Sequence, residues 1–68
     1  MEAHDTKELI ALINYMIHHN EHHNGELEEL ASTLKGVNEA AYKKVKDAIS
    51  DFEKGNAALG EAFKELSK

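Results

Sequence analysis

The chain has 68 residues, no cysteine, no proline and a formal net charge of −5. This length allows one domain, and the lack of cysteine excludes disulfides and thiolate metal sites. The acidic charge opposes binding to phosphates and to anionic lipid, so we expect neither a nucleic-acid nor a membrane partner. Chains shorter than roughly 70–80 residues usually need disulfides, a metal ion or self-association to be stable.

Apolar side chains in the first half recur at alternating steps of four and three residues, which is the spacing of a helical seam. The spacing stays in phase across Asn24 and Gly25, which favours one helix from about 5 to about 35, with Asp5 or Thr6 as its N-cap. A break at Gly25, giving a three-helix bundle, is the alternative. The predicted seam contains Leu9, Ile13, Met16, Asn20, His23, Leu27, Leu30 and Leu34.

A turn is predicted at 36–37, because Gly36 suits the left-handed conformation that ends many helices. Asn38 suits the N-cap of a second helix, with the backbone N–H of Ala41 as its partner. This second helix is expected from about 38 to about 67. Its predicted seam contains Val45, Ile49, Phe52, Asn56, Leu59, Phe63 and Leu66. Small residues lie at every seventh position beside it, namely Ala41, Ala48, Gly55 and Ala62.

Two long helices joined by a short turn predict an all-α antiparallel hairpin that forms a single domain over 1–68. One hairpin has only two helices and cannot enclose its own seam. We therefore expect a homodimer in which two hairpins form a four-helix bundle. The sequence shows neither a signal peptide nor an apolar run long enough to span a bilayer, so we expect a cytoplasmic location.

Four histidines, His18, His19, His22 and His23, lie within six residues of the first helix. Residues four apart face each other on a helix, so His18/His22 and His19/His23 are both spaced to chelate one ion. Imidazole suits Ni, Co, Zn and Cu better than Mg or Ca. Glu26, one turn further, is placed to act as another ligand or to fix a histidine tautomer. The sequence thus predicts a transition-metal site made by these five residues.

The main alternative is a structural role. In it, Asn20 and His23 form a polar layer that fixes the register of the helices, opposite Ile49 and Phe52. Other roles for the histidines are a pH response and axial ligation of a haem. No nucleophile lies beside a base and no Gly-rich phosphate loop is present, so we expect no enzyme. The two function hypotheses are a metal protein for storage, delivery or sensing, and a structural or protein-interaction helical module.

The stretch 12–23, LINYMIHHNEHH, followed by ELEEL at 26–30, resembles a small His-rich helical domain of anaerobic prokaryotes. The later segment 52–56, FEKGN, is similar to the second half of that family. The resemblance spans most of the chain and implies a natural two-helix module. Because the family has no assigned function, the resemblance implies nothing about the ligand.

Overall fold

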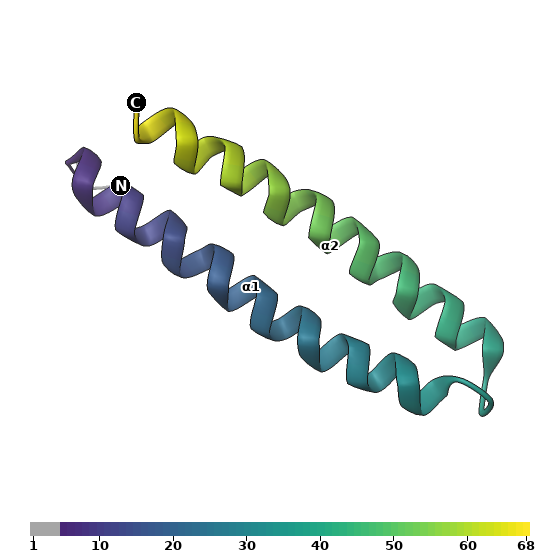
Figure 1. Cartoon of the computed structure of the whole chain (residues 1–68). Coiled ribbons are helices and arrows are strands. Elements are labelled where there is room, and N and C mark those ends of the chain that lie inside the picture. The colour runs from purple at the N-terminus through teal and green to yellow at the C-terminus, as the bar shows by residue number, and fades with distance from the viewer. Residues whose placement is uncertain (1–4) are drawn as a thin grey trace.

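A computed structural model describes residues 5–68, so the first four residues of the predicted domain lie outside the described residues. Two helices, α1 (Thr6–Leu34) and α2 (Glu39–Leu66), lie side by side as an antiparallel hairpin (Figure 1). Helix α1 runs continuously through Gly25. The hairpin is therefore confirmed, and the three-helix alternative is wrong. Within the described range, neither helix is long and apolar enough to cross a membrane.

The helices begin and end where the local chemistry predicts. The Asp5 carboxylate accepts a hydrogen bond from the backbone N–H of Glu8 at 2.8 Å, which caps α1. Gly36 has φ +85°, the left-handed conformation that glycine adopts without a steric penalty. The Asn38 side chain accepts a hydrogen bond from the N–H of Ala41 at 3.0 Å, which caps α2. The predicted turn and caps are thus confirmed.

The face of α1 that packs on α2 differs from the predicted seam at every second position. We call this face the inner seam, and all of its side chains are buried or half-buried. The prediction that His23 lies in the seam is wrong, because its side chain is 57% exposed. Asn24, the next residue, lies in the seam instead. The inner seam consists of Ile10, Ile13, Ile17, Asn20, Asn24, Leu27, Ala31 and Leu34.

The hydrophobic core of the hairpin is thin. Among the described residues, only Ala31 and Ile49 are buried hydrophobic residues, with 1% and 3% of their surface exposed. Three predicted seam residues, Met16, Leu30 and Phe52, keep about half of their surface exposed. A single hairpin therefore leaves much of its apolar surface in water, as expected for two helices that lack further partners.

Two polar contacts align the two helices, one near their middle and one closer to the turn. Asn20 Nδ2 donates to Asn56 Oδ1 at 3.1 Å, and Lys46 forms an ion pair with Glu28 at 3.2 Å. Asn20 was expected to face residues near Ile49 and Phe52, but it pairs with Asn56, about one helical turn beyond Phe52. Pairing the two half-buried amides with each other satisfies their hydrogen-bonding groups, which the apolar side chains of Ile49 and Phe52 cannot do.

Candidate metal centre

Two of the predicted ligands, His19 and His23, meet on the exposed side of α1. Their Nε2 atoms lie 2.9 Å apart. The ring centroids are 4.4 Å apart, and the ring planes are almost perpendicular at 84°. The α-helix causes this approach, since side chains four residues apart stand one above the other on the same face.

Each imidazole of this pair has a neighbour that restricts its orientation. Glu26 Oε1 lies 2.9 Å from His23 Nδ1, and the ring of Tyr15 stacks on that of His19 with a centroid distance of 5.6 Å. When His23 donates its Nδ1 hydrogen to Glu26, its Nε2 atom keeps a lone pair. That lone pair then accepts a hydrogen bond from His19 Nε2–H. The network is satisfied with both rings neutral.

The other two histidines are not brought into this pair. His18 Nδ1 lies 3.2 Å from a carboxylate oxygen of Glu21, and both side chains are largely exposed. The His22 ring lies 6.1 Å from the His23 ring, centroid to centroid. Within residues 5–68, no group of three or more His, Cys, Asp or Glu side chains is arranged to hold a metal ion. The arrangement in one chain is therefore a two-imidazole unit.

The spacing of this unit suits a shared metal ion. With Zn–N bonds of about 2.0–2.1 Å, two nitrogens on one ion lie about 2.9 Å apart at a right angle and about 3.3 Å apart at the tetrahedral angle. The observed separation of 2.9 Å between the Nε2 atoms of His19 and His23 lies at one end of this range. To bind an ion with both lone pairs, His19 must carry its hydrogen on Nδ1. Two or more coordination positions then remain for other ligands.

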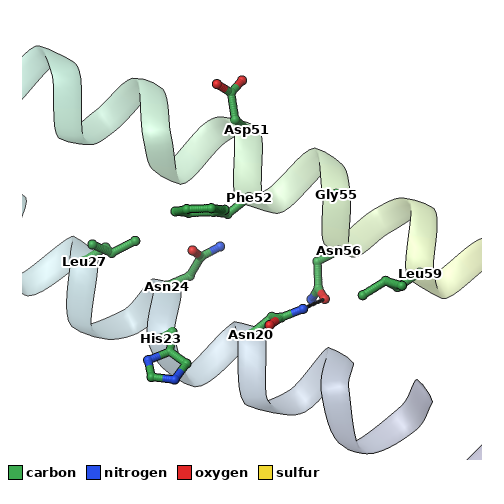
Figure 2. Close-up of a pocket in the computed structure, with 9 residues that line it drawn as sticks. All are labelled: Asn20, His23, Asn24, Leu27, Asp51, Phe52, Gly55, Asn56 and Leu59. Atoms are coloured by element: carbon green, nitrogen blue, oxygen red, sulfur yellow. Dashed lines mark hydrogen bonds between the residues drawn. The ribbon is translucent and has the colours of Figure 1, made fainter. Parts of the chain in front are cut away.

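A groove of about 460 Å³ between the helices is lined by His23 but not by His19. Figure 2 shows Asn24 and Phe52 between the two helices, whereas the His23 ring points away from α2. Asn56 also donates to the backbone oxygen of Ile17 at 3.2 Å, so its amide bonds to α1 twice. Sequence reasoning missed the pairing of Asn20 with Asn56, although both were recognised as polar seam residues. These amides align the helices, but they are not metal ligands.

The fold and the site define an elongated helical hairpin with an imidazole pair on an exposed flank of its first helix. The chain belongs to the family described as "Domain of unknown function (DUF8180)", whose model matches residues 9–66. This match covers nearly all of α1 and the whole of α2. No curated protein and no solved structure matches the chain. The comparisons therefore identify a family and assign no activity.

Proposed function

We propose that this chain is a small non-enzymatic protein of the cytoplasm that binds a divalent transition metal for storage, delivery or sensing. The observation that carries the proposal is the 2.9 Å approach of His19 Nε2 to His23 Nε2. The contact of Glu26 with His23 Nδ1 supports it, because metal-bound histidines usually donate their other ring N–H to a carboxylate, a backbone carbonyl or water. Imidazole ligands favour Ni, Co, Zn and Cu.

The roles of the predicted ligands differ in this proposal. His19 and His23 bind the ion, whereas Glu26 orients His23 from outside. His18 and His22 lie outside this pair and do not hold the ion. The proposal thus reduces the predicted set of five ligands to two direct ones.

Calorimetric titration of the untagged protein with Zn, Ni, Co and Cu, each offered separately, tests the proposal. We expect saturable binding of at least one of these ions, and we expect His19→Ala/His23→Ala to abolish it. His18→Ala/His22→Ala is the matched control, because it removes the same number of imidazoles at the same spacing. Helical circular dichroism should be the same in both variants, since all four side chains are exposed. Equal loss of binding in the two variants would contradict the assignment.

A second candidate function is a protein-interaction module, and the exposed apolar side chains favour it. Leu12, Met16, Leu30 and Phe52 all remain about half exposed. In this case the Asn20–Asn56 pair sets the register and the histidines are surface residues. Binding of no metal at micromolar concentrations, together with a stable complex with a partner helix, would favour this function.

A further inference from the structure

The exposed flank of α1 carries a second helical seam. We call it the outer seam, and its members again follow steps of four and three residues. All of them are exposed, although two are leucines and one is methionine. A seam of this spacing is the pattern that packs against another helix. The outer seam consists of Leu12, Met16, His19, His23, Glu26 and Leu30.

The chemistry of the outer seam is symmetric about the level of Glu21. Leu12 and Leu30 lie nine residues to either side of it, and His19 and His23 lie two residues to either side. If a second α1 packs against this seam in the opposite direction, each leucine meets a leucine and each histidine meets a histidine. An interface of this kind, in which both copies use the same surface, is typical of twofold dimers.

Helix α2 also carries a symmetric set of residues, and its centre lies at the same level along the hairpin as that of the outer seam. The hydrogen bond from Asn20 to Asn56 places Glu21 level with Gly55. Ala48 and Ala62 lie seven residues to either side of Gly55, and Gly55 lines the same groove as His23. One twofold axis can therefore relate both helices to their copies. The small side chains let the two copies of α2 approach closely.

The charges and dimensions also favour a second copy in the opposite orientation. A parallel pairing would place Glu26 against its own copy, whereas the antiparallel pairing separates the two carboxylates by ten residues, or about 15 Å along the helix. Met16 then meets the methylene groups of Glu26, whose carboxylate is bonded to His23. The hairpin measures 49 × 19 Å across its broad side. This area suffices for the roughly 800 Å² that each partner buries in a standard interface.

We propose that two copies of this chain pair through their outer seams in antiparallel orientation, and that four imidazoles, His19 and His23 from each copy, hold one transition-metal ion. This inference rests on the proposed function, and it completes a site that has only two imidazoles in one chain. Four protein ligands are the usual number for a closed zinc site, and four imidazoles would supply them. The metal would then link the copies, and the leucines at both ends of the seam would exclude water.

The orientation of the dimer is tested by disulfide crosslinking, since the chain has no natural cysteine. Leu12→Cys and Leu30→Cys are prepared separately, mixed in equal amounts and oxidised in the presence of the metal. The antiparallel pairing predicts a crosslink between the two different variants, because disulfides form only when the Cα atoms are within about 7 Å. Crosslinks mainly within one variant would overturn the proposed pairing.

The shared metal site is tested by native mass spectrometry of wild type, Gly55→Leu and Gly25→Leu with each ion. A Cβ atom at either glycine meets no atom within 4 Å in the hairpin, so both positions have open space and both variants should fold. We expect one ion per two chains in wild type and Gly25→Leu, and a monomer that binds at least tenfold more weakly in Gly55→Leu. A dimer with unchanged stoichiometry in Gly55→Leu would overturn the inference.

The same experiment separates failure of this inference from failure of the proposed function. A wild-type monomer that binds one ion through His19 and His23 would overturn the shared site and leave the proposed function intact. A dimer that binds no ion would overturn both the proposed function and the four-imidazole site, while the crosslinking pattern still reports the orientation.

Discussion

The contact between Asn20 and Asn56 leads to a quantitative prediction about the stability of the hairpin. The Asn56 side chain makes two hydrogen bonds to α1, one to Asn20 and one to the backbone oxygen of Ile17. A typical intramolecular hydrogen bond contributes about 0.5–1.5 kcal/mol net. Asn56→Ala should therefore lower the free energy of unfolding by about 1–3 kcal/mol, whereas Asn20→Ala, which loses one bond, should cost about 1 kcal/mol.

Replacing both partners should have a different effect. In the double variant Asn20→Leu/Asn56→Leu no half-buried amide is left without a partner, so we expect stability equal to or above that of the wild type. The two helices would then lack the polar contact that sets their register. Urea unfolding followed by helical circular dichroism measures these changes, at one fixed chain concentration because association raises apparent stability. Asn14→Ala, at an exposed site on α1, is the control and should stay within about 0.5 kcal/mol of wild type. Our reasoning fails if Asn56→Ala costs no more than Asn20→Ala, or if the double Leu variant is less stable than both.

Four further predictions concern the backbone, the core and the metal. Gly25→Ala should stabilise the chain by about 1 kcal/mol, because Gly25 lies inside α1 with open space around it, and thermal melting that shows no gain would contradict a continuous helix. Gly36→Ala should instead destabilise it by about 1–2 kcal/mol in the same assay, because φ is +85° there. Ile49→Ala should cost about 2–5 kcal/mol, since Ile49 is 3% exposed in a core with very few buried residues, and full helical content at room temperature with an unchanged urea midpoint would refute this. Glu26→Gln should weaken metal binding about tenfold in calorimetry by removing the carboxylate from His23 Nδ1, and unchanged affinity would show that Glu26 has no orienting role.

The sequence predicted the hairpin well because the decisive signals are local. The heptad phase across Gly25 indicates one helix, and the left-handed preference of Gly36 indicates the turn. The side-chain caps at Asp5 and Asn38 need only residues three positions away, so propensity and capping rules suffice. These elements do not depend on how α1 and α2 pack together.

The face of α1 that meets α2 was harder to predict. Residues 9, 16, 23 and 30 and residues 10, 17, 24 and 31 form two neighbouring lines, and each is apolar at three of its four positions. Periodicity alone cannot show which of these two lines faces α2, since that choice depends on packing against the other helix. The structure selects the second line, and this leaves His23 exposed where it meets His19. The facing pair follows from i, i+4 spacing, whereas the exposure of that pair depends on packing.

The elongated shape of the hairpin affects how its assembly should be measured. The radius of gyration is 15.6 Å, whereas a globular domain of this length has a value of about 11 Å. A rod diffuses more slowly than a sphere of equal mass, so this 7.6 kDa chain should elute early from a gel-filtration column even as a monomer. Elution volume would therefore overestimate its mass. Sedimentation equilibrium, which does not depend on frictional shape, gives the number of chains directly.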